Sequence, residues 1–333
     1  MTDHSQGQHS RLFARITLLA SAVTLLGASL AWNVSLASSF QGGAPPSSDA
    51  ERVAPSRADK IREFLLDESQ NGMIVVSHRG HHGAAPENTL AAIEAAAEVG
   101  AHIVEIDVRK TSDGGYVLMH DTTVDRTTVS KGRVADLTLE QVTRLQILDG
   151  QRPTAHRPPT LEQALETARG RVMLNIDLKT GSLVEVVEIA RSSGTVSLCL
   201  FKARWDRIEK GEHEWIARQP DVLFMPIARS FEESEEAIAA LGPPAVEIIQ
   251  PLDRTLGEEE AEIFERWSDA GVRTWANTLW NGRLAWGLSD YEAVEDPDAI
   301  FGTLIDHGVS IVQTDLPEVA VDVLRRRGDL PDF

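Results

Sequence analysis

The sequence has very few cysteines and a shortage of positive charge. Its 333 residues include one cysteine, Cys199, so the chain cannot form an intramolecular disulfide. Cys199 lies in the apolar run "VSLCLF". We expect a buried, unreactive thiol there, because reactivity requires a polar, electropositive setting. Lysine and arginine number 32 against 51 aspartates and glutamates, giving a net charge of −19. A surface this anionic repels polyanions, which argues against nucleic acid as a partner.

One uncharged run near the start of the chain has the layout of a targeting segment. Residues 16–32 carry no charge, follow two arginines and precede the small residues of "VSLASS". This order predicts a secretory signal over residues 1–37, cut after Ala37, with an uncleaved membrane anchor as the alternative. Both readings export the domain to the periplasm or the extracellular space. No cysteine follows the run, which excludes a lipoprotein anchor. We expect membrane contact through this segment alone.

The rest of the chain alternates strand and helix patterns. Residues 38–57 are rich in Gly, Pro and Ser and predict a flexible linker, so we expect the folded domain over residues 58–333. Eight β-like runs follow, at 73–80, 102–110, 172–179, 196–202, 222–228, 245–250, 272–279 and 310–315. Helical patterns separate most of them, at 88–99, 182–193, 205–218, 231–241, 257–270, 296–307 and 317–327.

This alternation predicts parallel strands joined by right-handed crossovers. Eight such units over roughly 260 residues predict an α/β fold, a (β/α)8 TIM barrel. A doubly wound open sheet is the alternative, and it fits less well because no glycine fingerprint follows the first strand. No stable protein partner is evident from the sequence.

The stretch between the second and third strands is longer than a simple crossover. Its "GGYVLMHD" predicts an added strand, paired through a turn at residues 113–115. Two short helical stretches follow, "LTLEQVTRL" and "TLEQALETA". We interpret both as a small insertion after strand two, an excursion on the barrel rim.

Carboxylates recur on one face of two neighbouring predicted strands. Glu105 and Asp107 of "VEIDV" stand two apart and point the same way, because side chains of a strand alternate between faces. In "LNIDLK", Asn175, Asp177 and Lys179 share a face. Inward carboxylates need a partner, and oxygen ligands suit the hard cations Mg²⁺ and Ca²⁺. The structural alternatives are that Glu105 and Asp107 are a structural pair salt-bridged to basic residues, and that Lys179 pairs with Asp177 instead of binding an anionic substrate group.

Two histidines end strands on what would be the same rim. His78 and Arg79 close the first strand within "SHRGHHGAAPENT", and His120 ends "VLMHD". Two histidines with pKa values near neutrality can act as general acid and general base. Arg79 carries a planar fork of donors that matches phosphate oxygens, and Gly80 would let the backbone approach a ligand. A metal, two histidines and a phosphate-binding arginine together indicate phosphodiester cleavage.

These residues, in this order, carry a family resemblance. The blocks "HRG", "PENT", "VEIDVRKTSDG" and "HDTTVDRTT" strongly resemble the glycerophosphodiester phosphodiesterase family over residues 77–128. Weaker matches continue through "PPTLEQAL", "LNIDLK", "GVRTWANTL" and "VQTDLPEVAVDVL". The resemblance implies a TIM barrel that hydrolyses glycerophosphodiesters, as small-molecule substrates, to glycerol 3-phosphate and an alcohol.

The resemblance also implies roles for particular residues. His78 and His120 would be the acid/base pair, and Glu105, Asp107 and Asp177 would bind one divalent metal. Arg79 and Lys179 would hold the phosphate of the substrate. Glu87 and Asn88 would line the substrate site, and Glu87 would assist the metal or orient His78. From its place at the end of a predicted strand, and not from the resemblance, we also predict that Trp275 contacts the substrate. One departure is that the family usually has glutamate where this chain has Asp177, although the related sphingomyelinase D group has aspartate there.

Several polar and aromatic residues around these motifs have two readings. We expect His81 and His82 to be exposed loop residues, with substrate contact as the alternative. Trp275 and Trp280 flank the end of a predicted strand, and the loop over residues 280–295 would be a pocket wall or lid, or simple packing.

The last predicted strand leads directly into a helix. We expect Thr314 and Asp315 to cap that helix, with Pro317 in its first turn.

Two rival functions remain at this point. One is a phospholipase D-like or cyclising enzyme of the same superfamily acting on lysophospholipids. The other is a non-catalytic barrel that only binds phosphodiesters.

Overall fold

The computed structural model describes residues 54–67, 69–209, 214–249, 255–279 and 285–333. The predicted signal and most of the predicted linker lie outside these residues. Ser56 caps the first helix, α1 (Arg57–Leu66), so regular structure begins within the last residues of that linker. None of the described helices is long and apolar enough to cross a membrane.

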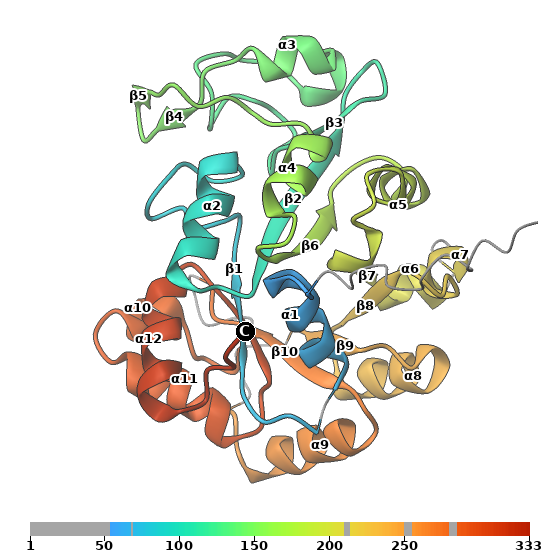
Figure 1. Ribbon diagram of the computed structural model, residues 1–333, viewed down its shortest axis with the longest axis vertical. Coiled ribbons are helices and arrows are strands. Elements are labelled where there is room, and N and C mark those ends of the chain that lie inside the picture. Colours follow the sequence, from blue (N-terminus) through green and yellow to red (C-terminus); the bar gives the residue numbers. More distant parts are fainter. Residues whose placement is uncertain (1–53, 68, 210–213, 250–254, 280–284) are drawn as a thin grey trace, which may run out of the picture. The chain divides into compact units, whose positions relative to one another are not determined.

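Eight parallel strands form a closed barrel (Figure 1). Around the ring they are β1 (Ile74–Ser77), β2 (Ile103–Lys110), β6 (Met173–Leu178), β7 (Cys199–Arg204), β8 (Leu223–Ala228), β9 (Ala245–Ile248), β10 (Arg273–Asn277) and β11 (Ile311–Thr314). β1 pairs with both β2 and β11, which closes the sheet. Each strand overlaps a predicted one, although residues 196–198 of the fourth predicted strand form a 3-10 turn. The TIM barrel is therefore confirmed, and the doubly wound sheet, which leaves two open edges, is excluded.

Amphipathic helices surround the strands (Figure 1). They are α2 (Leu90–Val99), α4 (Leu161–Ala168), α5 (Leu183–Ser192), α6 (Trp205–Glu209), α7 (Glu214–Ala217), α8 (Phe231–Leu241), α9 (Glu258–Asp269), α10 (Asp290–Ala293), α11 (Pro297–Asp306) and α12 (Pro317–Arg327). The single helix predicted over 205–218 is replaced by α6 and α7, and residues 210–213 between them lie outside the described residues.

The interpretation of "TLEQALETA" as part of the rim excursion is wrong. This segment is α4, which leads into β6 as a barrel crossover helix. Its Thr160 cap forms a reciprocal capping box with Gln163. Leu161 and Leu165 on its apolar face are buried in the core outside β2 and β6. A right-handed crossover between parallel strands requires such a helix, and the excursion is inserted ahead of it.

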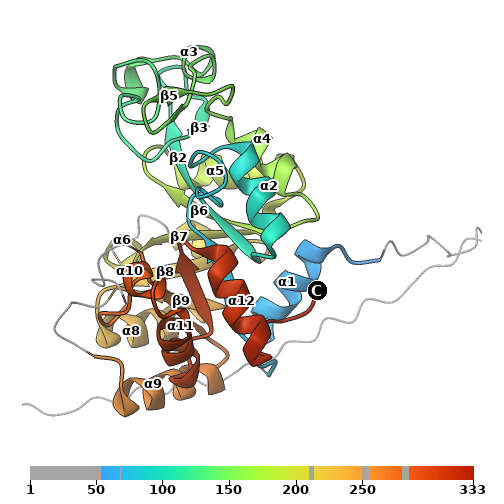
Figure 2. The same cartoon turned by 90° about the vertical axis from the view of Figure 1, so that its left-hand side faces the viewer.

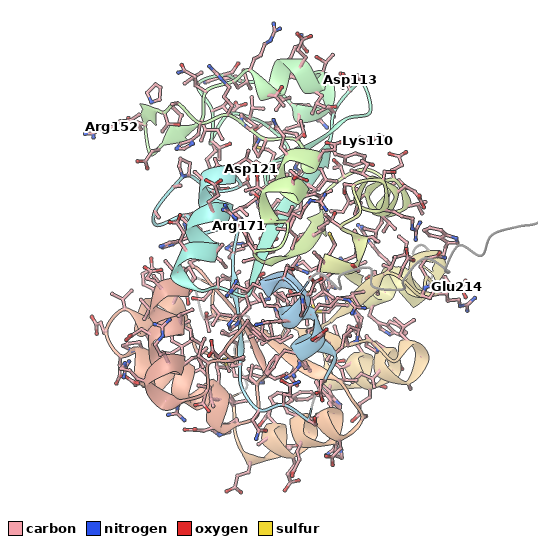
Figure 3. The ribbon with its side chains drawn as sticks, viewed as in Figure 1. Lys110, Asp113, Asp121, Arg152, Arg171 and Glu214 are labelled. Atoms are coloured by element: carbon pink, nitrogen blue, oxygen red, sulfur yellow. The ribbon has the colours of Figure 1, made fainter. Side chains whose placement is uncertain are left out.

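The excursion itself joins β3 to α4. β3 (Tyr116–Leu118) pairs antiparallel with β2 through the predicted turn, which Lys110 and Asp113 mark in Figure 3. The chain then forms a 3-10 turn (Val134–Asp136), α3 (Leu139–Thr143) and a two-stranded sheet of β4 (Leu148–Asp149) and β5 (Arg152–Pro153). Figure 2 shows α3 and β5 away from α8 and α9.

Helix α1 is an element that the sequence patterns did not reveal. Ile61 and Leu65 are fully buried, and they pack against inward residues of the barrel strands, among them Met173 and Trp275. Arg273, buried in β10, donates hydrogen bonds to three carbonyls at the end of α1, those of Phe64, Leu65 and Asp67. The helix therefore covers the end of the barrel that is opposite to the C-terminal ends of the strands.

The strands separate an apolar outer face from a layered interior. Val104, Ile106 and Val108 of β2 pack outward beneath the helices, as predicted. Their neighbours point inward, beginning with the apolar Ile103 and continuing to polar residues at the C-terminal end of the strand. Cys199 is also buried in the outer core, and burial raises the pKa of its thiol to about 12, so it is the inert thiol expected.

Candidate active site

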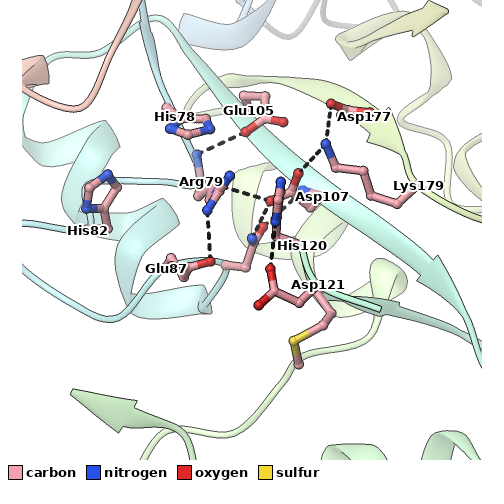
Figure 4. A network of polar contacts seen from close by, with 12 residues as sticks. His78, Arg79, His82, Glu87, Glu105, Asp107, His120, Asp121, Asp177 and Lys179 are labelled. Carbon is pink, nitrogen blue, oxygen red and sulfur yellow. Dashed lines mark hydrogen bonds and ion pairs between the residues drawn. The ribbon is translucent and has the colours of Figure 1, made fainter. Parts of the chain in front are cut away.

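Three carboxylates meet inside the C-terminal end of the barrel. Asp107 of β2 and Asp177 of β6 are register partners in adjacent strands, and Glu105 lies one pleat below on the same face. One oxygen from each can be chosen so that all three lie within 4.8 Å of one another. Glu105 and Asp107 are buried, while Asp177 is partly exposed (Figure 4). The structure therefore brings together all three predicted metal ligands, which we call the carboxylate cluster.

The carboxylate cluster has the chemistry of a hard-cation site. All its donors are oxygens, and Asp107 Oδ1, although 3.0 Å from Lys179 Nζ, accepts no hydrogen bond from the described residues. Burial, followed by the charge of Asp107, raises the pKa of Glu105. Burial also acts to raise the pKa of Asp107, but the charges of Lys179 and Arg79 outweigh it and lower that pKa. A bound divalent cation would lower the cost of holding these charges together.

Each predicted acid/base histidine has a carboxylate partner. His78 Nδ1 lies 2.7 Å from Asp315 Oδ1, and His120 Nδ1 lies 2.8 Å from Asp121 Oδ1. A carboxylate at Nδ1 favours the tautomer with the proton there, which leaves Nε2 of each ring for proton exchange with a substrate. His78 is buried, whereas the His120 side chain is 36% exposed. Both rings lie beside the carboxylate cluster in Figure 4.

The "PENT" loop is built around the carboxylates. Asn88 Nδ2 donates to Asp107 Oδ2 over 2.7 Å, and the backbone N–H of Asp107 donates back to Asn88 Oδ1. The Arg79 N–H donates to Glu105 Oε2 at 3.1 Å. Arg79 and Asn88 both have positive φ angles, 54° and 57°, which are costly for residues other than glycine. Asn88 is therefore a positioning residue for Asp107 in this structure.

Gly80 serves packing instead of ligand approach. Its φ is +77°, and a Cβ placed there would lie 2.7 Å from the carbonyl carbon of Ala92. The following residue, His81, donates its backbone N–H to the Ala92 carbonyl. The missing side chain therefore lets the loop pass close to α2, which corrects the prediction that it admits a ligand.

The hydrogen-bond and ion-pair partners of Glu87 among the described residues are arginines, and not the metal-cluster carboxylates or His78. It accepts hydrogen bonds from Arg126 at 2.7 and 2.8 Å and from Arg79 at 3.2 Å. Arg126 also donates to Asp121, the partner of His120. Glu87 thus links the two histidine loops through Arg126, a residue that the sequence analysis left unassigned although it stands in the quoted block "HDTTVDRTT".

Asp315 is a functional-site residue that the sequence analysis assigned wrongly. The cap residue of α12 is Leu316, which makes no side-chain cap bond, so Thr314 and Asp315 are not caps, whereas Pro317 does occupy the first turn. Asp315 Oδ1 lies 2.6 Å from His82 Nε2 as well as 2.7 Å from His78. The signal was strand alternation, since position 315 shares the inward face of positions 311 and 313.

The expectation of exposed histidines in the first loop is also wrong. His81 is buried, with Nε2 3.5 Å from Glu318, and the His82 side chain is 24% exposed. Its hydrogen bond to Asp315 raises the pKa of His82. His82 therefore shares one carboxylate oxygen with His78.

Trp275 lies in the barrel core and not at a substrate surface. It is fully buried, and its Nε1 donates to Asn277 Oδ1 at 2.8 Å. Asn277 in turn donates to Glu247, and Glu247 accepts from the buried Lys202. Sequence analysis missed Lys202 and Glu247, although each stands at an inward position of an apolar strand.

The loop after β10 is described only in part. Trp280 lies outside the described residues. Trp286 is buried, and the carboxylate of the buried Asp290 accepts hydrogen bonds from Thr278, Thr314 and the N–H of Asp315. This described part packs beneath Asp315 and supports the histidine site, as the packing alternative predicted.

Two cavities are lined by residues of the candidate site. One, of about 250 Å³, lies over the β1 and β2 loops and is lined by His82, Pro86, Glu87, Arg126, Thr127 and residues 147–150 of the excursion. The other, of about 400 Å³, lies over β6 to β9 and includes Asp177 and Lys179. Lys179 Nζ is 2.7 Å from Asp177 and 3.0 Å from Asp107. Lys179 therefore pairs with Asp177, as the structural alternative predicted, and it also lines the second cavity.

Comparison with protein families divides the chain in two. The sequence model described as "Glycerophosphoryl diester phosphodiesterase family" matches residues 78–224, and a domain of unknown function matches residues 224–324. The first match contains both histidines and the carboxylate cluster.

Curated relatives match about a third of this chain. The glycerophosphodiester phosphodiesterase of Caldanaerobacter subterraneus is 42% identical over 111 residues, covering 32% of this chain and 46% of the relative. Mouse glycerophosphodiester phosphodiesterase 1 is 49% identical over 130 residues, covering 38% of each chain. This chain therefore spans less than half the length of these relatives.

Solved structures match over a longer range. A glycerophosphodiester phosphodiesterase from Agrobacterium tumefaciens has a TM-score of 0.60 at 25% identity, covering 75% of this chain and 99% of that one. One from Parabacteroides distasonis has a TM-score of 0.67 at 22% identity, covering 83% and 93%. A phosphodiesterase from Oleispira antarctica in complex with the product sn-glycerol-3-phosphate has a TM-score of 0.57 at 21% identity, covering 79% and 99%.

Proposed function

We propose that this chain, which belongs to the glycerophosphodiester phosphodiesterase family, hydrolyses glycerophosphodiesters to glycerol 3-phosphate and an alcohol. One observation carries the proposal. Two histidines, each with a carboxylate at Nδ1, lie beside three converging carboxylates at the C-terminal end of a barrel. A barrel that only binds phosphodiesters would need neither the two Nε2 atoms nor their carboxylate partners.

Glu105, Asp107 and Asp177 would hold one divalent cation, Mg²⁺ or Ca²⁺. Such an ion supplies Lewis-acid stabilisation of a phosphate oxygen and offsets the developing negative charge. Lys179 and Arg79, which border the cluster, would bind the remaining phosphate oxygens as charged donors. The Asp177 carboxylate lies 2.7 Å from Lys179 Nζ, so the same lysine borders the metal ligand and the phosphate position.

The histidines would move the protons. One Nε2 accepts the proton of the attacking hydroxyl, which belongs either to the neighbouring glycerol carbon or to water, as its oxygen forms a bond to phosphorus. The bond from phosphorus to the alcohol oxygen breaks, and the other Nε2–H donates its proton to that oxygen. Attack by the glycerol hydroxyl gives a cyclic phosphate, which water then opens with the two proton transfers reversed.

The test is an assay of the purified protein on glycerophosphodiesters, in which the concentration of divalent metal is controlled. Bis(glycerol) phosphate and glycerophosphocholine are supplied with Mg²⁺ or Ca²⁺ after chelation, and released glycerol 3-phosphate is measured. We expect turnover that is lost by at least ~10²-fold in His78→Ala and in His120→Ala. Binding without turnover in the wild type would favour the non-catalytic barrel, and turnover of lysophospholipid alone would favour the lipid-acting rival.

We also propose that the domain is exported by residues 1–37 and joined to them by the linker. The support is the order of charged, apolar and small residues in the sequence. Mass spectrometry of the protein recovered from its producing cells tests this. A chain that begins at Ser38 outside the cytoplasm is expected, and an intact N-terminus in the membrane fraction would support the anchor.

A further inference from the structure

The larger cavity beside the carboxylate cluster is lined by more cationic than anionic side chains. This β6–β9 pocket, of about 400 Å³, is lined by charged side chains of both signs: Lys179, Lys202, Arg204, Arg207, Asp177 and Glu247. Four are cations and two are carboxylates, and one of the carboxylates belongs to the metal cluster. The chain as a whole carries a net charge of −19, so most of its surface repels anions. The pocket differs from the rest of the chain because cations outnumber carboxylates in its lining.

Lys202 lies on the inner wall of the pocket. Its side chain is 3% exposed, and Nζ lies 3.2 Å from Glu247 Oε2 and 3.9 Å from Asp177 Oδ2. Nζ is also 5.9 Å from the centre of the buried Trp275 ring. Lys202 therefore brings a buried ammonium group to the pocket wall, where Glu247 is its nearest carboxylate.

Two arginines line the outer part of the pocket. The side chain of Arg204, at the end of β7, is 40% exposed and donates two hydrogen bonds to the carboxylate of Asp206, from Nε at 2.9 Å and from Nη2 at 2.5 Å. That fork leaves the Arg204 side chain oriented, with further N–H donors on the guanidinium. Arg207, one turn later in α6, is exposed and lines the same cavity.

The opposite cavity lacks this excess. The charged residues around it are Arg126, Glu87 and Asp149, together with His82. Arg126 is held by Glu87 and Asp121. The cavity has a volume of about 250 Å³, which suffices for a glycerol arm held by neutral hydrogen bonds. A neutral glycerol gains little from three further cations, whereas a second anionic group would gain charge-assisted hydrogen bonds.

We infer that the β6–β9 pocket is a second anion subsite, which selects phosphodiesters whose alcohol carries a phosphate or carboxylate. The inference rests on the proposed function and narrows its substrate class. Lys202, Arg204 and Arg207 bind the second anion, while the carboxylate cluster and histidines act on the scissile phosphate. A cationic alcohol such as choline would meet these same charges and be disfavoured.

A matched pair of substrates tests the subsite. Bis(glycerol) phosphate is compared with the same diester bearing a phosphomonoester on its second glycerol, and glycerophosphoserine provides a carboxylate arm. We expect kcat/KM to be at least ~10-fold higher for the phosphate-bearing substrate at low salt, and this ratio to fall as ionic strength rises. A carboxylate preference without a phosphate preference would identify the source of the anion as a carboxylic acid.

Variants of the outer arginines assign the effect. Arg204→Gln combined with Arg207→Gln should lower the ratio toward one, and Arg204→Lys should retain part of it. Arg326→Gln is the matched control, because Arg326 is also held by a neighbouring aspartate but lies on α12. Circular dichroism of each variant verifies the fold.

The outcomes separate the two proposals. Failure to hydrolyse either substrate contradicts the proposed function. Hydrolysis of the neutral diester with wild-type ratios near one for both the phosphate-bearing and the carboxylate-bearing substrate, or a preference unchanged in the double arginine variant, overturns the subsite alone.

Discussion

Replacing Asp315 by asparagine should slow catalysis without unfolding the barrel. Asp315 Oδ1 accepts from His78 Nδ1 at 2.7 Å and from His82 Nε2 at 2.6 Å, and its side chain is 3% exposed. Asparagine keeps the shape but loses the charge that stabilises a protonated His78, and its amide can donate to Nδ1 and reverse the tautomer. The loss of one buried charge-assisted hydrogen bond is about 2–3 kcal/mol.

That energy corresponds to a decrease in kcat on the order of 10²-fold. The assay is steady-state hydrolysis of bis(glycerol) phosphate at saturating substrate, with Asp322→Asn as the matched control, since Asp322 is exposed on α12. Turnover of Asp315→Asn within about threefold of wild type, in a folded protein, would refute the role assigned to Asp315. A decrease in both variants would indicate a general effect of lost negative charge.

The same carboxylate gives the fold a pH dependence. Burial acts to raise the pKa of Asp315, but the hydrogen bonds from His78 and His82 outweigh it and lower the pKa from 3.8 to about 2. A lowered pKa means that the carboxylate stabilises the fold above pH ~4, and that this contribution is lost as the pH falls toward 2. The shift corresponds to about 2 kcal/mol. Urea unfolding between pH 5 and pH 2.5 should show a shallower loss of stability in Asp315→Asn than in wild type, and equal slopes would contradict the assignment.

Three further predictions address the shell around the site. Asn88→Ala and Asn88→Gly should both weaken metal binding, measured by calorimetry, because both lose the hydrogen bonds to Asp107. Asn88→Ala should lower the melting temperature more than Asn88→Gly, because only alanine strains the left-handed backbone, by about 1 kcal/mol. Lys202→Met should lower the free energy of unfolding by about 3–5 kcal/mol, because the buried Glu247 carboxylate loses its charged partner. Combining Lys202→Met with Glu247→Gln should recover most of that loss. Equal stability of the single and double variants would argue against the ion pair. Chelation should abolish hydrolysis reversibly, with Mg²⁺ or Ca²⁺ restoring it, and full activity in excess chelator would remove the metal from the mechanism.

Much of the architecture followed from local patterns. Period-two alternation in "VEIDV" and "LNIDLK" placed Glu105, Asp107 and Asp177 on inward faces, because the direction of a side chain along a strand depends only on its position. Alternation of strands and helices then led to the barrel, since right-handed crossovers leave few other topologies. Helix α1 was not predicted although Ser56 and Asp59 form a capping box at its start; what no local pattern encodes is its docking at the far end of the barrel.

The partners within the site could not be predicted in the same way. His78 and Asp315 are 237 positions apart, and they meet only because β1 and β11 pair to close the ring. His82 looked like an exposed loop residue for the same reason.

The sequence by itself determined the strand and helix order, the inward carboxylates and the two histidines, because these depend on periodicity and short motifs. Only the tertiary structure decided what each side chain contacts. Ring closure gave His78 its carboxylate, the close approach of α2 explained Gly80, and the meeting of β6, β7 and β9 assembled the cationic pocket. Hydrogen bonds and ion pairs act over a few ångströms, so they are set by distances in space that the order of residues does not contain.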